Sequence, residues 1–360
     1  MDDISVIRYA YFFRRWETLA AHGGGILSRL KSNPLYYFLL PFLIFSQLVT
    51  IIRLLRRNSF DIIHAHWLIP QGLLALLACR LTGRDIPVVL TSHGGDLYAL
   101  NGWFLNYLKH WVMKQCRHLT VVSEAMRSSV IAMGLSPLKV SLIPMGVDLV
   151  GQFKPDRAIQ RNPAELLFVG RLVEKKGVLL LIEAMPLLLH SHPSLRLRIA
   201  GDGPLSNQLR QRANALEVED HCEFLGMVYQ EKIPSLLSRA TIFIAPFQIA
   251  KGGDQEGLGL VLVEAAGCEC PIIAGDVPAV HDVINDGVNG LLINPGDSNA
   301  LVNAVSVLLT DPQRRSRLGS IARKYCLDRF DWEIITDRYG KLLMDCANTA
   351  CINCQDSQSQ

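Results

Sequence analysis

The chain has 360 residues, enough for two domains of ordinary size, and its apolar fraction of 49% excludes a disordered protein. The overall charge of +3 says little, but residues 1–150 carry a net charge of +7 and the remainder carries −4. A basic first half favours an anionic surface or substrate as its partner, and a solvated basic surface explains it equally well. We expect no nucleic-acid partner.

The nine cysteines show no disulfide framework. Most lie in apolar segments, for example Cys79, Cys116, Cys222 and Cys326, as is typical of reduced core thiols in a cytosolic protein. No histidine stands at zinc-finger spacing from the others, so we expect no metal. The chain opens with acidic and aromatic residues instead of a signal peptide. We therefore predict a cytoplasmic protein, with peripheral contact to the inner membrane face as a further expectation.

Residues 4–11 (ISVIRYAY) predict a strand, and residues 35–52 form an apolar run without charge. The run has 18 residues, the threshold for a membrane-spanning helix, but Pro41 and several polar residues weaken that interpretation. We rank a core-packed helix first and a true span last. A helix lying on a membrane surface ranks second and is favoured by the flanking basic residues Lys31, Arg53, Arg56 and Arg57.

Short apolar strands alternate with helices from residue 60 to 150 and again from 164, a pattern that predicts parallel sheets covered on both faces. Residues 153–163 are polar and predict a linker. We therefore predict two Rossmann-like domains, 1–152 and 164–330, with the ligand at the carboxyl ends of the strands. A helix over 331–346 is expected to pack back toward the first domain, before a disordered tail over 347–360.

Residues 251–266 (KGGDQEGLGLVLVEAA) are the most informative segment. Glu264 lies in an otherwise apolar run that predicts a buried helix, where an unbound carboxylate is costly. Gly257 and Gly259 allow backbone N–H groups to approach a ligand, and a helix N-terminus favours an anion. Because each Cβ leans toward the N-terminus, Glu264 points back at the loop that carries Glu256. A sugar nucleotide has both the phosphate and the hydroxyl groups that this arrangement suits.

Two cations and a histidine also follow predicted strands. Arg171 stands at the carboxyl end of a strand and Lys176 at the start of the next helix, where they can grip a diphosphate from two sides. Ordinary surface charges explain them equally well. His93 ends an apolar strand before two glycines, where it can hydrogen-bond a sugar hydroxyl or assist proton movement. A hydrogen-bonded structural histidine is the alternative.

Other polar residues near strand ends give weaker signals. For His64 and His66 a structural role is favoured, because one of each alternating pair faces the core. Asp96 follows the His93 glycines, and Ser123 is first a helix N-cap and second a residue of the cleft. We take Asp96 and Ser123 as acceptor-side candidates. The Gly201 turn is weak by itself.

Together these segments resemble the family-4 glycosyltransferases with the GT-B fold, over about residues 60 to 340. The matching pieces are HAHW, LTSHGGD, VVSEAM, IPMGVD, FVGRLVEKKG, IAGDGP, APF and EGLGLVLVEAAGC. The resemblance implies a nucleotide-sugar donor held mainly by the second domain, a retained anomeric configuration, and neither metal nor other cofactor. One departure is that the first domain is expected to lack one or two opening strands.

The resemblance also implies roles for residues at the matching positions. Glu256 would hold the transferred sugar and Glu264 the ribose, while Gly201 would lie near the base and His93 would contact the sugar from the first domain. The diphosphate would be bound by Arg171, Lys176 and the backbone N–H groups of Gly257, Leu258 and Gly259.

We therefore predict a hexosyltransferase that uses a nucleotide-diphosphate sugar and a glycan, glycolipid or lipid-linked acceptor. A catalytically impaired sugar-nucleotide-binding protein of the same fold is the first alternative. A dinucleotide-dependent oxidoreductase is disfavoured because no G-x-G-x-x-G follows a strand. An integral membrane protein that uses residues 35–52 is the remaining alternative.

Overall fold

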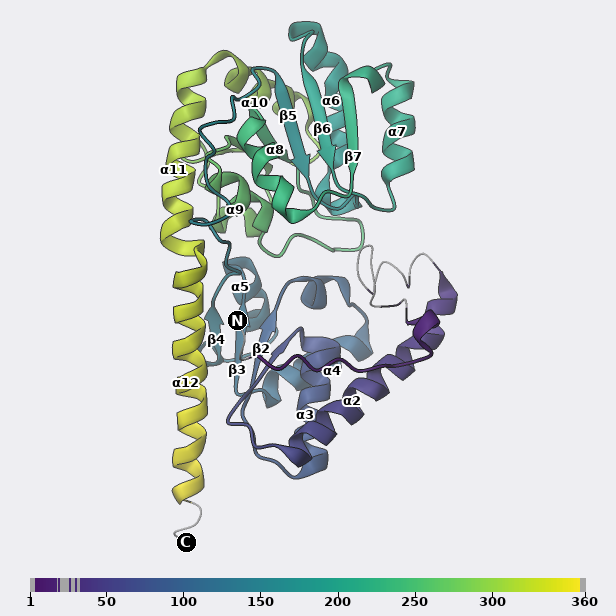
Figure 1. Cartoon of the computed structure of the whole chain (residues 1–360), viewed down its shortest axis with the longest axis vertical. Coiled ribbons are helices and arrows are strands. Elements are labelled where there is room, and N and C mark those ends of the chain that lie inside the picture. Colours follow the sequence, from purple (N-terminus) through teal and green to yellow (C-terminus); the bar gives the residue numbers. More distant parts are fainter. Residues whose placement is uncertain (1–3, 18, 20–25, 27–29, 31–32, 357–360) are drawn as a thin grey trace.

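The computed structural model describes residues 4–356 except 18, 20–25, 27–29 and 31–32, and it contains two parallel sheets. The first has four strands in the order β1-β2-β3-β4, and the second has six in the order β10-β9-β8-β5-β6-β7. Figure 1 shows the two sheets in separate domains, one above the other, with helices packed around each. The predicted pair of Rossmann-like α/β domains is therefore confirmed.

The first domain is built from short apolar strands, a sequence pattern typical of a sheet that is covered on both faces. Every residue of β2 is buried, including Thr91 and Ser92. The strands are β1 (Ile63–His66), β2 (Val88–Ser92), β3 (His118–Val121) and β4 (Val140–Leu142). The helices around them are α3 (Leu73–Thr82), α4 (Trp103–Gln115) and α5 (Glu124–Ala132).

The second domain has the larger sheet, and its central strands β8 and β9 are buried throughout. The strands are β5 (Glu165–Val169), β6 (Arg196–Ala200), β7 (Cys222–Gly226), β8 (Ile242–Ala245), β9 (Ile272–Gly275) and β10 (Leu291–Ile293). The helices are α6 (Val178–Ser191), α7 (Ser206–Ala215), α8 (Ile233–Arg239), α9 (Leu260–Gly267) and α10 (Ser298–Thr310). The carboxyl ends of β5 and β8 lead into the loops that carry the predicted site.

Two long helices, α11 (Pro312–Phe330) and α12 (Trp332–Asp356), run along both domains (Figure 1). They join where Val147 pairs with Asp331 and the backbone N–H of Trp332 donates to the Val147 carbonyl. The Tyr339 hydroxyl of α12 lies 3.3 Å from the hydroxyls of Thr91 and Thr120 in the first domain. The helix continues to Asp356, so the prediction of a disordered tail from 347 is wrong for residues 347–356, while 357–360 lie outside the described residues.

The first residues of the chain differ from the prediction. Residues 4–11 form no strand, and the Ser46 hydroxyl of helix α2 (Leu40–Arg57) donates to the Ala10 carbonyl. The end of the segment therefore contacts α2, while Ile4, Val6 and Ile7 are largely exposed.

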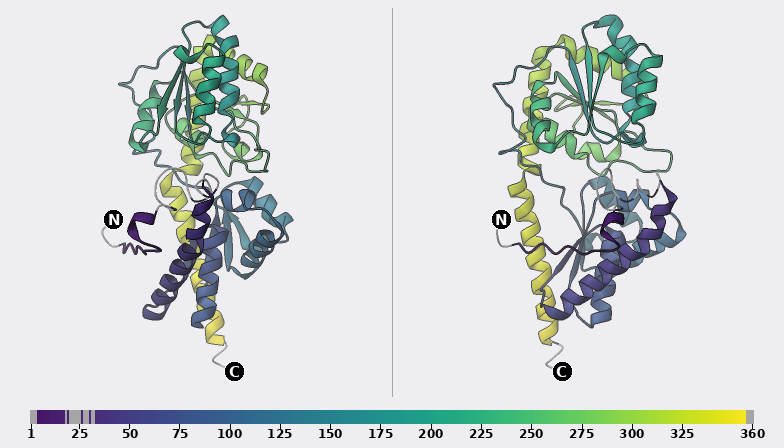
Figure 2. Two further views of the ribbon diagram at one scale, coloured as in Figure 1. Left: turned by 90° about the vertical axis from the view of Figure 1, so that its right-hand side faces the viewer. Right: turned by 45° about the vertical axis from the view of Figure 1, so that its right-hand side comes forward.

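The apolar run at 35–52 forms a short 3₁₀ helix, Pro34–Leu39, that continues into α2. It is the one helix in the described part of the chain that is long and apolar enough to cross a membrane, with a mean hydropathy of 2.1. Only 17% of its most apolar window is buried, so the favoured prediction of a core-packed helix is wrong. One side of α2 packs along α3, and much of the remainder is accessible (Figure 2). Lys31, one of its predicted flanking charges, lies outside the described residues.

Candidate active site

Two glycine loops, one from each domain, meet backbone to backbone at the boundary between the domains. A Cβ on Gly257 would lie 2.5 Å from the carbonyl oxygen of His93. Gly94 has a φ of +95°, and a Cβ there would lie 2.9 Å from the Cα of Gly257. Both positions require glycine, because any side chain would push the loops apart. The close approach brings the end of β2 to the loop that precedes α9.

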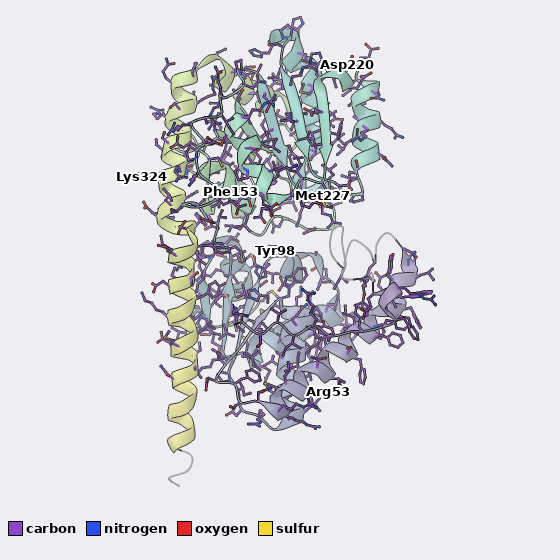
Figure 3. All side chains as sticks on the ribbon, viewed as in Figure 1. Arg53, Tyr98, Phe153, Asp220, Met227 and Lys324 are labelled. Carbon is purple, nitrogen blue, oxygen red and sulfur yellow. The ribbon has the colours of Figure 1, made fainter. Side chains whose placement is uncertain are left out.

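A cavity of about 380 Å³ opens beside this contact. The first domain contributes His93, Val122 and Met145. The second domain contributes Val169, Gly170, Lys176, Glu256, Leu258, Gly259, Leu260, Val261 and Glu264. Figure 3 shows the boundary, with Tyr98 on the first domain and Met227 on the second. The structure thus places four of the predicted side chains, those of His93, Lys176, Glu256 and Glu264, around one hollow.

Lys176 and Glu256 form a mostly buried ion pair in this cavity. The Lys176 Nζ lies 2.8 Å from the Glu256 Oε2, with the side chains 14% and 15% exposed. Burial by itself raises the pKa of Glu256, but the ammonium groups of Lys176 and Lys175 outweigh it and hold the pKa below its usual value. Gly177 makes the turn that delivers Lys176, because it has a φ of +68° and any Cβ would overlap the Pro246 carbonyl oxygen. The pair places the Lys176 ammonium group and the Glu256 carboxylate side by side in the cavity lining.

Glu264 is the unpaired carboxyl group of the cavity. It lies on α9, which begins after Gly259 at a φ of +81°. Burial raises the pKa of Glu264 to about 7, with the nearby Lys176 acting in the opposite direction. None of the described residues donates a hydrogen bond to its carboxyl oxygens. The group is therefore available to accept hydrogen bonds from a ligand.

Both the ring and the backbone of His93 make hydrogen bonds within the first domain. Its Nε2 lies 2.8 Å from the Nδ1 of His66, with the two rings stacked, and its backbone N–H donates to Asp96. Burial and the neighbouring His66 lower the pKa of His93 against the opposing charge of Asp96. The imidazole is therefore a neutral hydrogen-bonding group near pH 7.

His66 is a site residue that sequence reasoning set aside as structural. The parallel pairing of β1 and β2 places His66 opposite Thr91, so that both strands deliver a histidine to the same sheet edge. The sequence shows a histidine at the end of each strand, in HAHW and in SHG, but only the strand register shows that the two histidines are neighbours. His64 has the structural role that was favoured for it, because its Nε2 lies 2.7 Å from the Thr91 hydroxyl and burial lowers its pKa to about 4.

Two predicted donor-binding residues, Arg171 and Gly201, lie outside the cavity lining. Arg171 is half-buried and outside the cavity lining, where burial lowers its pKa and the charge of Asp254 raises it. Gly201 has a φ of +147°, and any Cβ there would overlap the carbonyl oxygen of Gly170, which does line the cavity. Gly201 therefore shapes the cavity by close packing at the ends of β5 and β6.

The two acceptor-side candidates do not face the cleft. Asp96 is fully buried and accepts hydrogen bonds from the backbone N–H groups of Leu68 and His93 and from the Ser92 hydroxyl. Ser123 is also fully buried and caps α5 through the backbone N–H of Met126. A buried carboxylate needs such donors, so these contacts account for Asp96 without a ligand. Both residues position loops of the first domain.

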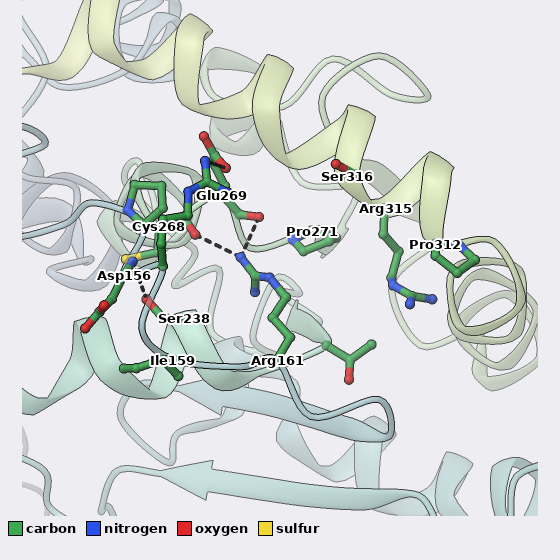
Figure 4. A pocket seen from close by; sticks show the side chains of 13 residues that line it. Asp156, Ile159, Arg161, Ser238, Cys268, Glu269, Pro271, Pro312, Arg315 and Ser316 are labelled. Carbon is green, nitrogen blue, oxygen red and sulfur yellow. Dashed lines mark hydrogen bonds and ion pairs between the residues drawn. The ribbon is translucent and has the colours of Figure 1, made fainter.

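A second cavity, of about 300 Å³, lies between the linker and α11 (Figure 4). Arg161 points into it, but its guanidinium donates to the carbonyl oxygens of Leu237, Ala240, Cys268 and Glu269. These bonds fasten the linker to the second domain. No group of three or more His, Cys, Asp or Glu side chains suited to a metal ion occurs within the residues that the structure describes.

Two parallel β/α domains with a charged cavity between them define a GT-B type of protein. The family model for glycosyltransferase family 4 matches residues 8–150, and the model for glycosyl transferases group 1 matches residues 151–325. The chain belongs to the family-4 glycosyltransferases and is a glycosyltransferase enzyme. The resemblance predicted from the sequence is thereby confirmed.

Individual relatives agree with this family. A GDP-mannose-dependent α-(1-6)-phosphatidylinositol monomannoside mannosyltransferase of Mycolicibacterium smegmatis is 30% identical over 288 residues, which are 76% of this chain and 74% of that protein. A glycogen synthase of Mycobacterium tuberculosis is 28% identical, over 76% of this chain and 66% of that protein. Among solved structures, Anabaena HepE in complex with UDP has a TM-score of 0.72 at 21% identity and 90% coverage of both chains. This last likeness concerns the fold.

Proposed function

We propose that the chain transfers a hexosyl group from a nucleotide-diphosphate sugar to an acceptor hydroxyl, with retention of anomeric configuration. One observation carries the proposal: His93 from the first domain and Lys176, Glu256 and Glu264 from the second line the same cavity of about 380 Å³. A cation, two carboxyl groups and a neutral imidazole match a ligand that carries both phosphate and hydroxyl groups.

The donor is assigned to the second domain. Lys176 and the backbone N–H groups of residues 257–259 would bind the diphosphate, since the N-terminus of α9 favours an anion. Arg171, on the same loop as Gly170, would be the second cation. Glu264 would accept hydrogen bonds from the ribose hydroxyls and Glu256 from the transferred sugar. Gly201, which packs against the cavity-lining Gly170, would lie near the base.

The proposed step is a front-face displacement. The bond from the anomeric carbon to the diphosphate oxygen breaks while a bond to the acceptor oxygen forms on the same face of the sugar. The acceptor hydroxyl gives its proton to the departing phosphate oxygen, and nucleoside diphosphate is released. Lys176 stabilises the negative charge that develops on the leaving group, as a metal does elsewhere, and we propose that no metal is needed. His93 would hold a sugar hydroxyl from the other side.

The acceptor class is proposed as a glycan, a glycolipid or a lipid-linked sugar. The mycobacterial relative acts, by its name, on a phosphatidylinositol mannoside, and the glycogen synthase acts in polysaccharide synthesis.

A thermal-shift screen against UDP-, GDP- and ADP-sugars tests the donor proposal, and a rise in melting temperature with one of them is expected. Transfer from that donor is then followed with and without EDTA, and the product linkage is assigned by NMR. An inverted linkage would contradict the front-face mechanism, and loss of activity in EDTA would contradict the metal-free proposal. Binding with neither transfer nor hydrolysis would favour the sugar-nucleotide-binding alternative.

A further inference from the structure

A cluster of aromatic side chains lies exposed beside the amino-terminal end of α2. The ring of Phe12 contacts those of Phe13, Trp16, Phe38 and Phe42, with centroids 5.1–6.4 Å apart. Phe38 is 65% exposed and Phe42 is 40% exposed despite these contacts. Folded proteins seldom leave a contiguous apolar surface of this kind open to water unless it binds something.

The exposed stripe continues along α2 and changes chemistry. Phe38, Phe42 and Phe45 follow one another at helical spacing, and Phe45 is 68% exposed. Near its carboxyl end the helix then carries the exposed residues Arg53, Arg56 and Arg57, the last two in its final turn. Figure 3 labels Arg53 at the end of α2 that lies away from the domain boundary. We define Phe38, Phe42, Phe45 and these three arginines as the α2 face.

The charge around the α2 face is almost wholly positive. The described residues between 4 and 60 include six arginines and a single acidic residue, Glu17, and the acidic Asp61 follows. Glu17 is already engaged, because its Oε1 accepts hydrogen bonds from the backbone N–H groups of Tyr11 and Phe12. The surface therefore complements an anionic partner that also offers apolar material.

The packing of α2 distinguishes a helix that lies on a bilayer from one that crosses it. Leu55 is buried in the core cluster that includes α3, whereas Leu43 is buried in a separate cluster with Leu19 and Leu39. The Ala10 carbonyl accepts a hydrogen bond from Ser46. Soon after Arg57 the chain enters β1, at the edge of the first sheet. A spanning helix would have to leave this packing, whereas a helix lying on the surface keeps it.

We propose that the α2 face docks the protein onto the anionic lipid surface of a membrane. The phenylalanines enter the boundary between headgroups and acyl chains, and the arginines bind lipid phosphates. An anionic bilayer supplies apolar acyl chains and negatively charged headgroups side by side, and this combination matches the aromatic and basic side chains of the α2 face. The proposal does not depend on glycosyl transfer, and it adds a partner that would hold a lipid-borne acceptor near the enzyme.

Flotation of the purified full chain with vesicles tests the proposal. We expect binding to vesicles of phosphatidylcholine and phosphatidylglycerol, little binding to phosphatidylcholine alone, and release as salt is raised. The double substitution Phe38→Ser and Phe45→Ser should lower the partition coefficient about tenfold or more. Each of Arg53→Gln, Arg56→Gln and Arg57→Gln should lower it by about fivefold.

The matched control is Leu187→Ser, which removes a 52% exposed apolar side chain from α6 of the other domain and should leave binding unchanged. Circular dichroism confirms that each variant folds. Failure of the wild type to float with anionic vesicles at low salt would overturn the proposal, as would equal losses in the α2 and α6 variants. Resistance of the membrane-bound protein to carbonate extraction would show a span instead. A dimer without lipid that Phe38→Ser and Phe45→Ser dissociates would assign the face to a second copy.

Discussion

Helices α9 and α2 are both built from apolar runs, yet they have opposite surroundings. In α9, Leu262, Val263, Ala265 and Ala266 are fully buried, because α8, α11 and β9 contact the helix from several directions. In α2, the main helical contact is with α3, and Phe42 and Phe45 are exposed. The hydropathy of a segment therefore does not decide its burial, which depends on how many neighbouring elements the fold packs around it.

The same difference separates the roles of the two helices. Burial of most of α9 makes Glu264, on its cavity side, expensive to ionise. Incomplete burial of α2 leaves an aromatic and basic surface free to contact another phase. The following predictions test that contrast, and the largest expected effect comes first.

Removing an apolar side chain should lower the free energy of unfolding much more in α9 than in α2. Leu262→Ala should lower the free energy of unfolding by about 2–5 kcal/mol, because it leaves a cavity in a packed core. Phe45→Ala should change it by less than about 0.5 kcal/mol, because that side chain is largely in solvent. Urea unfolding monitored by circular dichroism measures both, and similar losses would contradict the contrast.

Lys176→Met should lower kcat/KM by about 10²- to 10³-fold, since it removes the cation assigned to the leaving diphosphate. Lys175→Met is the matched control, because the Lys175 ammonium binds Asp254 and the Gln255 carbonyl instead of lining the cavity. The control should lose about tenfold or less, through the loop that it supports. Steady-state transfer assays distinguish the two, and equal losses would remove Lys176 from the proposed chemistry.

Glu264→Gln should alter the pH dependence of both stability and donor binding. The pKa of Glu264 is about 7 in the folded protein, against 4.5 for an ordinary glutamate in water. The stability contributed by the neutral carboxyl group is therefore complete below about pH 4.5 and lost as the pH rises through 7. The variant should therefore melt higher than the wild type at pH 8, with the difference shrinking toward pH 5.

Donor binding by the wild type should strengthen as the pH rises, whereas the stability contributed by Glu264 falls. The ionised carboxylate is the better acceptor for ribose hydroxyls, so wild-type binding should tighten as the pH rises through 7. Glu264→Gln should flatten that dependence and weaken binding about tenfold at pH 8. Calorimetric titration across pH 6–8 measures it, and parallel pH profiles for the two proteins would count against the assignment of Glu264 to the ribose.

His66→Asn should lower kcat only severalfold, because His66 positions His93 without itself being assigned to the sugar. His66 contributes to the lowered pKa of His93, so its loss should move the acidic limb of the pH–rate profile to higher pH. A merely structural role would not cause this movement. His118→Asn, at a histidine that pairs with Ser141 away from the cavity, should leave the profile in place.

Sequence patterns by themselves determined the β/α order, the two domains and the family. Period and spacing are local properties, so the apolar strands and the separation of Glu256 from Glu264 are visible in the chain. The glycine at 257 was also visible, although its reason, contact with the His93 carbonyl, was not. These features can be predicted from the sequence because they depend on residues that are close together in the chain.

Tertiary structure alone decided which of those residues share a cavity. Register between β1 and β2 brings His66 to His93, and the buried carboxylate of Asp96 accepts hydrogen bonds within the first domain instead of lining the cavity. Arg171 and Lys176 follow the same strand, but only Lys176 lines the cavity. Whether α2 is core or surface also depended on neighbours that the run itself does not specify. Contacts between distant segments set each of these outcomes, and no local pattern contains them.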